Sequence, residues 1–302
     1  MTGPAGVSGP VRLLGAGDIR EIAGRLGVRP TKKLGQNFVV EPGSVRQIAA
    51  LAGIRQDDVV LEVGPGLGSL TLALLEAVRE TAGTVVAVEI DPVLAAELPK
   101  TIAERAAAVA DRATVLTADA LQLGEQEVGA PPPTVLAANL PYNIAVPVVL
   151  NLLAALPSLR RGVVMVQAEV ADRMCAGPGS RVYGTPSAKL AWYASARLGG
   201  TVPRTVFWPV PNVDSKLVVF TRRDPPPTTA SREQVFAVVD AAFSQRRKTL
   251  RAALAGWAGS PTEAERALRA AGVDPSLRGE TLSISDFARI AEAGRLAAPG
   301  TK

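Results

Sequence analysis

The fold class of this chain is indicated most clearly by the segment Asp58-Val-Val-Leu-Glu-Val-Gly-Pro-Gly-Leu-Gly68. Its β-branched residues predict a buried strand and its glycines a tight loop, and the pattern of Ser69–Glu76 predicts a helix after them. Glycines at such a turn let the backbone approach a ligand closely, as in nucleotide-binding β-α-β units. The spacing is G-x-G-x-G, however, and Ser69 stands at the last position of the dinucleotide fingerprint.

Two carboxylates follow the next two predicted strands. Glu89 ends the strand Thr84–Glu89, where an acid can accept hydrogen bonds from both hydroxyls of a ribose. Asp119 follows the strand Ala113–Thr117 and is suited to accept a hydrogen bond from an adenine. The glycine loop contains no lysine and no G-x-G-x-x-G, so neither a nucleoside triphosphate nor NAD fits well. S-adenosylmethionine fits, because it has an adenine, a ribose and a cationic sulfonium but no phosphate.

The tetrad Asn139-Leu-Pro-Tyr142 indicates chemistry on the exocyclic amine of a base. That amine is a poor nucleophile because its lone pair is delocalised into the ring. The side-chain oxygen of Asn139 and the backbone carbonyl of Leu140 or Pro141 can accept its two hydrogens and draw the nitrogen towards tetrahedral geometry. Tyr142 offers a flat face on which an extruded base can stack. An ordinary Asn-Pro-type turn is the alternative for the tetrad alone, but its order after the loop and the two acids favours base methylation.

Six motifs together resemble one family, the small-subunit (16S) ribosomal RNA adenine dimethyltransferases, over about residues 18 to 290. The motifs are Lys33-Leu-Gly-Gln-Asn-Phe38, Glu62-Val-Gly-Pro-Gly-Leu-Gly68, Asn139-Leu-Pro-Tyr-Asn-Ile144, Met165-Val-Gln167, Phe207-Trp-Pro-Val-Pro-Asn-Val-Asp-Ser215 and Phe243-Ser-Gln-Arg-Arg-Lys-Thr-Leu-Arg251. The resemblance implies an enzyme that uses S-adenosylmethionine to dimethylate two adjacent adenosines near the 3′ end of small-subunit RNA, late in ribosome assembly.

The resemblance also implies roles for individual residues. Tyr142 and Phe207 would lie on either side of the target adenine. Ala168 and Ala252 depart from the family, which usually has Lys and Asn there, and this affects expected RNA contacts rather than the reaction. The residues implied to hold the cofactor are Asn37, Val39, Gly64, Gly66, Glu89, Asp119 and Asn139.

Composition excludes several other classes of enzyme. The 302 residues contain no histidine, which excludes a Ser-His-Asp hydrolase and most kinds of zinc site. Methyl transfer to a neutral amine needs neither. The single cysteine, Cys175, excludes an internal disulfide and suits a reducing cytoplasm. We expect no metal, a cytoplasmic location and a monomer.

An uncharged stretch from Val128 to Leu159 invites comparison with a membrane span. Its density of proline and asparagine argues against a lipid-exposed helix. A buried parallel strand over Thr134–Ala138, the catalytic turn and a core-facing helix explain it better. We therefore expect no membrane association.

Positive charge is concentrated between Arg204 and Arg251, which contains nine Lys and Arg against four acids. That surplus equals the net charge of the whole chain, +5. A basic stripe close to a base pocket is expected where a protein contacts phosphates, although a solvated helix face is the alternative. Four residues are the candidates for binding RNA: Arg246, Arg247, Lys248 and Arg251.

The predicted fold class is α/β, a Rossmann-like S-adenosylmethionine-dependent methyltransferase sheet followed by a small C-terminal all-helical domain. Further strands at Val163–Gln167 and Lys216–Phe220 give a largely parallel sheet with antiparallel members at one edge. The predicted organisation is a disordered tail (1–17), a catalytic domain (18–223), a Pro-rich linker (224–229) and a helical RNA-binding domain (230–302). Helices are expected in the last of these at Ser231–Phe243, Lys248–Trp257, Thr262–Ala271 and Ser285–Ala297.

Two other functions remain open from the sequence. One is dimethylation of a large-subunit (23S) adenine, which confers antibiotic resistance. The other is a non-catalytic ribosome-assembly factor that binds RNA. The expected partner is small-subunit RNA or the assembling small subunit.

Overall fold

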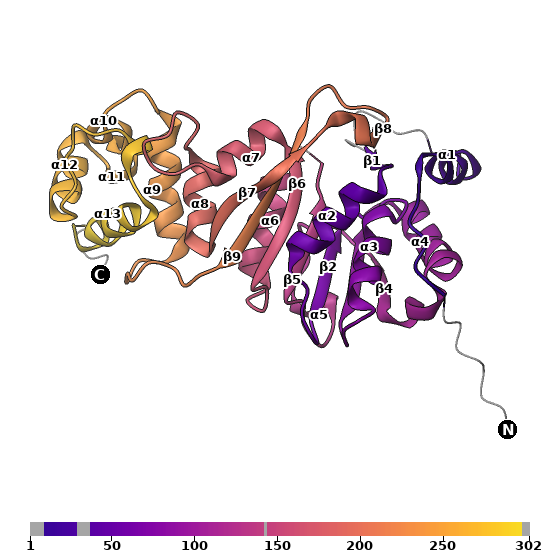
Figure 1. The fold of residues 1–302 in the computed structure, drawn as a ribbon. Coiled ribbons are helices and arrows are strands. Elements are labelled where there is room, and N and C mark those ends of the chain that lie inside the picture. The colour runs from indigo at the N-terminus through magenta and orange to yellow at the C-terminus, as the bar shows by residue number, and fades with distance from the viewer. Residues whose placement is uncertain (1–8, 29–36, 142–143, 298–302) are drawn as a thin grey trace. The chain divides into compact units, whose positions relative to one another are not determined.

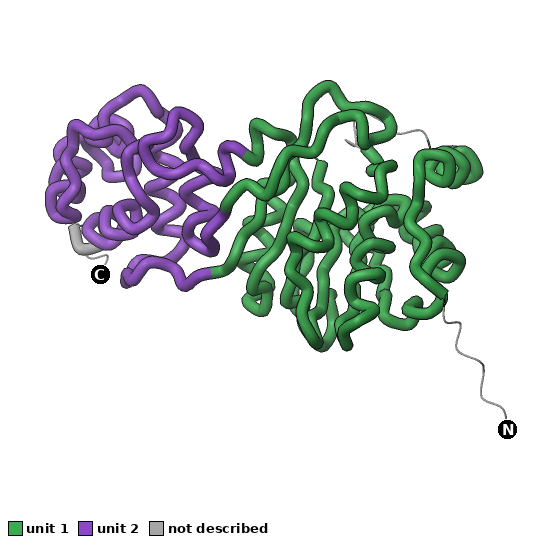
Figure 2. Tube along the Cα trace, in the orientation of Figure 1, with its two compact units in different colours: residues 1–171, 197–222 green, residues 172–196, 223–302 purple. Residues whose placement is uncertain are grey.

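The structure is a computed structural model that describes residues 9–28, 37–141 and 144–297, with the side chains of the last three left out. The chain forms two compact units, shown in different colours in Figure 2. Unit 1 comprises residues 1–171 and 197–222, and unit 2 comprises residues 172–196 and 223–302. Unit 2 therefore includes residues 172–196, which the sequence analysis assigned to the catalytic domain.

Unit 1 is built around a seven-stranded sheet with the order β4-β3-β2-β5-β6-β9-β7 (Figure 1). The strands β4, β3, β2, β5 and β6 are parallel, and β9 runs antiparallel to β6. This confirms the predicted Rossmann-like sheet with an antiparallel member towards one edge. The bounds are β2 Val59–Val63, β3 Thr84–Glu89, β4 Ala113–Thr117, β5 Val135–Asn139, β6 Arg161–Gln167, β7 Ala194–Val202 and β9 Ser215–Arg222.

The helices of unit 1 begin where local chemistry allows it. Asp91 accepts a hydrogen bond from Val93 N and caps α4, and Glu41 caps α2 in the same way. The helix α3 follows Gly68, whose φ of +96° favours glycine. The bounds are α1 Ala16–Arg25, α2 Pro42–Ala52, α3 Ser69–Val78, α4 Pro92–Arg105, α5 Glu125–Val128, α6 Ala145–Ala155 and α7 Ala168–Cys175, the last of which runs into unit 2; the 3-10 turns are η2 Ala107–Arg112 and η3 Arg204–Val206.

The uncharged stretch forms β5 and α6, both of which contribute to the core. Among the described residues, no helix combines the length and apolar character that crossing a membrane requires.

The predicted tail over residues 1–17 is wrong for its described part. Val11 and Leu14 are buried in the hydrophobic core, and Arg12 N donates to the carbonyl of Arg105 at 2.8 Å. An ion pair of 2.6 Å between Arg105 and Asp18 holds α1 against α4. The local composition, rich in Gly and Pro, gave no indication of this apolar anchor.

Unit 2 is helical, and three of the four predicted helices are confirmed. The fourth, Lys248–Trp257, is two short helices, with Leu254 between them. The unexpected member is α8, which precedes the Pro-rich segment; Trp192 and Tyr193 at its end pack edge-on against Phe236. The bounds are α8 Thr185–Tyr193, α9 Arg232–Ser244, α10 Leu250–Ala253, α11 Ala255–Ala258, α12 Pro261–Ala270, η4 Gly279–Thr281 and α13 Ile284–Ala297.

One carboxyl group is buried in the middle of the sheet. Glu62 on β2 is 1% exposed, and neither of its oxygens has a hydrogen-bond partner among the described residues. Burial raises the pKa of Glu62 to about 8, and the nearby charge of Glu89 acts in the same direction. Glu62 is therefore protonated in the folded protein at neutral pH.

This burial predicts how stability depends on pH. The unfolded chain releases the Glu62 proton near pH 4.5, but the folded protein keeps it until about pH 8, so Glu62 destabilises the fold progressively as pH rises through that window. Glu62→Gln should lessen the decline by about 1.4 kcal/mol per pH unit. Urea unfolding between pH 5 and 9 measures this, with the exposed Glu80→Gln as control. Equal slopes for Glu62→Gln and wild type would contradict the burial argument.

Candidate functional site

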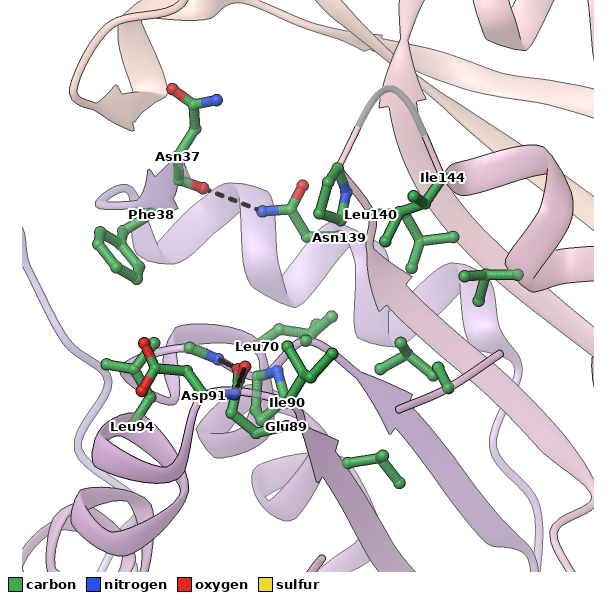
Figure 3. Close-up of a pocket in the computed structure, with 18 of the residues that line it drawn as sticks. Asn37, Phe38, Leu70, Glu89, Ile90, Asp91, Leu94, Asn139, Leu140 and Ile144 are labelled. Carbon is green, nitrogen blue, oxygen red and sulfur yellow. Dashed lines mark hydrogen bonds between the residues drawn. The ribbon is translucent and has the colours of Figure 1, made fainter. Parts of the chain in front are cut away.

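A cavity of about 300 Å³ opens at the carboxyl ends of β2, β3 and β5. Ligands bind at this edge in open α/β sheets, because the loops that leave the strands converge there. Figure 3 shows Asn37 and Asn139 on one side of the cavity and Glu89 and Asp91 on the other. The predicted residues that line it are Asn37, Val39, Gly64, Gly66, Glu89, Asp119, Asn139, Leu140 and Pro141.

The glycine loop forms the floor of the cavity through backbone geometry that other residues rarely adopt. Gly64 and Gly66 have φ of +70° and +57°. A Cβ on Gly66 would lie 3.0 Å from the ring of Phe38, which also lines the cavity. A side chain at position 66 would thus push Phe38 away, so the close approach of loop and ring requires glycine.

Glu89 is held in place by backbone amides at the end of β3. Its two oxygens accept hydrogen bonds from Gly66 N and Asp91 N, both at 3.0 Å. The residue is 6% exposed, and burial raises the pKa of this carboxyl group, against the effect of those two amides. Each carboxylate oxygen can accept a further hydrogen bond, which matches two vicinal hydroxyls of a ribose.

The lining of the cavity also includes another acid, Asp119, and apolar side chains. The Oδ1 of Asp119 accepts a hydrogen bond from Leu121 N at 2.9 Å. Ile90 also lines the cavity and is 65% exposed, and Leu94 lies nearby on α4. Such a mixture suits a flat heterocycle with a hydrogen-bonding edge. Neither Ile90 nor Leu94 was predicted from the sequence to line the cavity, although Ile90 directly follows Glu89 at the strand end.

Asn139 lies at the end of β5, and a hydrogen bond to the backbone of Asn37 fixes the orientation of its side-chain amide. Its Nδ2 donates to the carbonyl of Asn37 at 3.1 Å (Figure 3). No described residue donates to its Oδ1. The Pro141 carbonyl accepts a hydrogen bond from Ile144 N at 3.3 Å, whereas the described residues supply no donor to the Leu140 carbonyl. Within the described part of the chain, two acceptors therefore have no donor: the Asn139 Oδ1 and the Leu140 carbonyl.

Two aromatic residues, Tyr142 and Phe207, are predicted to contact the target base. Tyr142 lies outside the described residues. Phe207 is 3% exposed, packs in the hydrophobic core and is not among the residues that line the cavity, so its contact with the adenine stays a prediction. It lies on the short strand β8 (Phe207–Trp208), which pairs with β1 (Phe38–Val39), and pairing turns its ring inwards. The neighbouring Trp208 is partly exposed and stacks on Phe38.

The nine cations between Arg204 and Arg251 are divided between the two units. Arg204, Lys216 and Arg222 lie in unit 1. Arg222 donates to carbonyls at the end of α6, including that of Leu156 at 3.0 Å, which is a structural role.

In unit 2, the four predicted RNA-binding residues separate into two kinds. Arg246 pairs with Glu280 at 2.9 Å and donates to the Arg181 carbonyl at 2.6 Å, and Arg251 pairs with Glu265 at 2.8 Å. The side chains of Arg247 and Lys248 are exposed.

A cationic cluster nevertheless forms in unit 2, from segments that are distant in sequence. Gly179 N donates to the Glu280 carbonyl at 2.7 Å, which joins the loop before α8 to the turn that contains η4. Arg246, in the turn after α9, donates hydrogen bonds to Glu280 and to the Arg181 carbonyl, and so connects that turn with both segments. The cations of this cluster are Arg181, Arg246, Arg247, Lys248 and Arg278.

The family described as ribosomal RNA adenine dimethylase matches residues 28–294. The chain is 67% identical to the protein named ribosomal RNA small subunit methyltransferase A of Kineococcus radiotolerans, over 92% of this chain and 91% of the relative.

Two solved structures have the same fold. A dimethyladenosine transferase from Plasmodium falciparum superposes with a TM-score of 0.67 at 24% identity, over 83% of this chain and 94% of that one. The 23S rRNA methyltransferase ErmE superposes with a TM-score of 0.61 at 27% identity, over 85% of this chain and 98% of that one.

Proposed function

The chain belongs to the ribosomal RNA adenine dimethylase family, and we propose that it dimethylates two adjacent adenosines near the 3′ end of small-subunit (16S) ribosomal RNA. It is an S-adenosylmethionine-dependent methyltransferase. The observation that carries the proposal is the presence in one cavity of Glu89, Asp119 and Asn139, each at or just beyond the end of a parallel strand. Together these residues suit a nucleoside cofactor and an amine substrate.

The lining fits S-adenosylmethionine better than a phosphate-bearing cofactor. Its charged members are Glu89, Asp91 and Asp119, and no Lys or Arg is among the described residues that line the cavity. Glu89 would hold the ribose, Asp119 the adenine, and the glycine loop would approach the ligand through its backbone. When bound, the cofactor supplies a methyl group on a cationic sulfonium, which an anionic lining stabilises electrostatically.

Asn139 and Leu140 would prepare the target amine. The Asn139 Nδ2 is taken by the Asn37 carbonyl, so its Oδ1 is the atom left to accept one amine hydrogen. The Leu140 carbonyl would accept the other, in preference to that of Pro141, which already accepts from Ile144 N. We further propose that the ring of Tyr142 stacks on the extruded adenine.

Two observations decide against the alternative functions. The relative at 67% identity is named for the small subunit, whereas the structure named for 23S rRNA shares 27% identity. A purely RNA-binding factor has no need for Glu89 and Asn139 in a cavity that a glycine loop also lines.

Unit 2 would bind the RNA. The surface proposed is the cationic cluster defined above, since exposed Arg and Lys side chains neutralise phosphates and so release counterions. We propose that the protein acts as a monomer in the cytoplasm on small-subunit RNA or the assembling small subunit.

The cationic cluster can be tested by the salt dependence of binding. Arg247→Ala combined with Lys248→Ala should lower the slope of log Kd against log salt concentration by about 1 to 2, because each lost phosphate contact releases one counterion fewer. The matched control is Arg266→Ala with Arg269→Ala, two exposed cations already paired with Glu263 and Glu265 on the same helix. Equal slopes for the two double variants would remove the cluster from the RNA interface.

The substrate is tested by offering both ribosomal subunits. The protein is incubated with labelled S-adenosylmethionine and either small or large subunits from cells that lack the modification. Incorporation into small subunits alone is expected. Incorporation into large subunits alone would favour the resistance-type enzyme, and none into either would favour the non-catalytic factor.

A further inference from the structure

Two short strands from distant parts of unit 1, β1 and β8, form a ribbon beside the cavity. β1 and β8 pair antiparallel, with Phe38 opposite Trp208 and Val39 opposite Phe207. The ring of Trp208 stacks on that of Phe38, with centroids 6.3 Å apart and an interplanar angle of 22°. Phe207 anchors the ribbon in the core. A strand of two residues has little stability of its own, so β1 depends on these contacts for its position.

The ribbon is also fixed to the cofactor side of the cavity. Ser69 Oγ, at the start of α3, donates to the Val39 carbonyl at 2.7 Å. The ring of Phe38 lies directly over the position that a Cβ of Gly66 would occupy. Phe38 therefore lies between the glycine loop and Trp208.

The residue before the ribbon holds the amide of Asn139. The Asn37 carbonyl, which accepts from Asn139 Nδ2, precedes Phe38 by one peptide unit. The direction of the Asn37 carbonyl depends on the position of β1. That position is set by the stacking of Phe38 on Trp208 and by the pairing with β8. If this carbonyl moves, the amide of Asn139 loses the bond that keeps its Oδ1 available.

We propose that Trp208 is a positioning residue: by stacking on Phe38 it fixes the Asn37 carbonyl, which in turn orients the Asn139 amide for methyl transfer. The inference rests on the proposed function, because it assigns Trp208 a role in that reaction. Trp208 touches neither substrate nor cofactor in this account. Substitution of Trp208 should therefore lower kcat rather than the affinity for the cofactor, because Glu89, Asp119 and the glycine loop keep their own contacts.

The test compares three substitutions at Trp208 on undermethylated small subunits. Trp208→Ala should lower kcat on the order of 10-fold or more, as small misplacements of a reacting group do. Its Kd for S-adenosylmethionine should stay close to wild type. Trp208→Phe should recover most of kcat because it retains a flat ring. Trp208→Leu, which retains apolar volume without a flat face, should resemble Trp208→Ala and serves if the alanine variant fails to fold.

A double-mutant cycle with Asn139→Ala distinguishes positioning from general structure. If Trp208 acts through Asn139, adding Trp208→Ala to Asn139→Ala should lower single-turnover methylation no further. Val210→Ala, at an exposed side chain on the same segment, is the control and should have wild-type kcat. Wild-type kcat in both Trp208→Ala and Trp208→Leu, or additive losses in the cycle, would overturn the proposal. Inactive wild-type protein would instead refute the proposed function.

Discussion

Asn139→Ala is expected to lower kcat for methyl transfer on the order of 10²-fold or more, the loss typical when one preorganised polar group is removed from a transition state. The residue supplies a side-chain acceptor in the cavity, and its Nδ2 is already committed to the Asn37 carbonyl. Without it, one of the two acceptors for the amine is missing. Turnover on undermethylated small subunits measures the effect.

Binding of the subunit should survive this change, because the proposed phosphate contacts lie in unit 2. A matched control is Asn151→Ala. Asn151 also donates its Nδ2 to a backbone carbonyl, that of Ala120 at 3.3 Å, but it does not line the cavity. Its kcat should be close to wild type. An Asn139→Ala variant that remained active would contradict the proposed mechanism.

Glu89→Ala should raise the Kd for S-adenosylmethionine on the order of 10²-fold, since hydrogen bonds to a charged acceptor contribute about 1.5–3 kcal/mol each. The variant loses the acceptor for the ribose hydroxyls and also the anchor of Gly66 N. Isothermal titration calorimetry measures the change. Glu80→Ala removes the same charge from an exposed position and should bind as wild type does.

The pH dependence of cofactor binding provides a second readout for Glu89. Its pKa is raised by burial, and its charged form is the one that accepts from the hydroxyls, so affinity should fall as pH drops through that raised value. The loss should begin above the usual glutamate pKa of 4.5. Glu89→Gln should bind more weakly but with a flatter profile. A wild-type profile that is flat down to pH 4.5 would show that the ribose contact is made elsewhere.

The cofactor half of the cavity could be predicted from sequence because its parts are local. Each of Glu89, Asp119 and Asn139 ends or directly follows an apolar strand, and parallel strands deliver their carboxyl ends to one edge. Glycine tolerates the positive φ that the tight turn needs at Gly64 and Gly66, so the position of the turn could be predicted as well.

The parts that escaped prediction depend on contacts between distant segments. The two residues of β1 pair with β8 near residue 207, and no periodicity shows in strands so short. The motif around Phe207 did not show that strand pairing buries this residue and leaves Trp208 partly exposed. α8 joins unit 2 because Trp192 packs on Phe236, which no local pattern indicates.

Charge shows the same limitation. The cations between Arg204 and Arg251 look like a stripe in sequence, yet they divide between the two units, and Arg222 and Arg251 are occupied by internal partners. Arg246 donates to the Arg181 carbonyl and to Glu280, which lies in the same turn as Arg278, and sequence could not reveal these contacts.

If this cavity dimethylates adenine in small-subunit RNA, the identity of the modified base should show it. Wild-type protein is incubated with S-adenosylmethionine and unmethylated small subunits, and the RNA is digested and mapped by mass spectrometry. The account predicts two adjacent adenosines near the 3′ end, each carrying two methyl groups on the exocyclic amine. Methylation of another base, of a ring nitrogen or of ribose would contradict it.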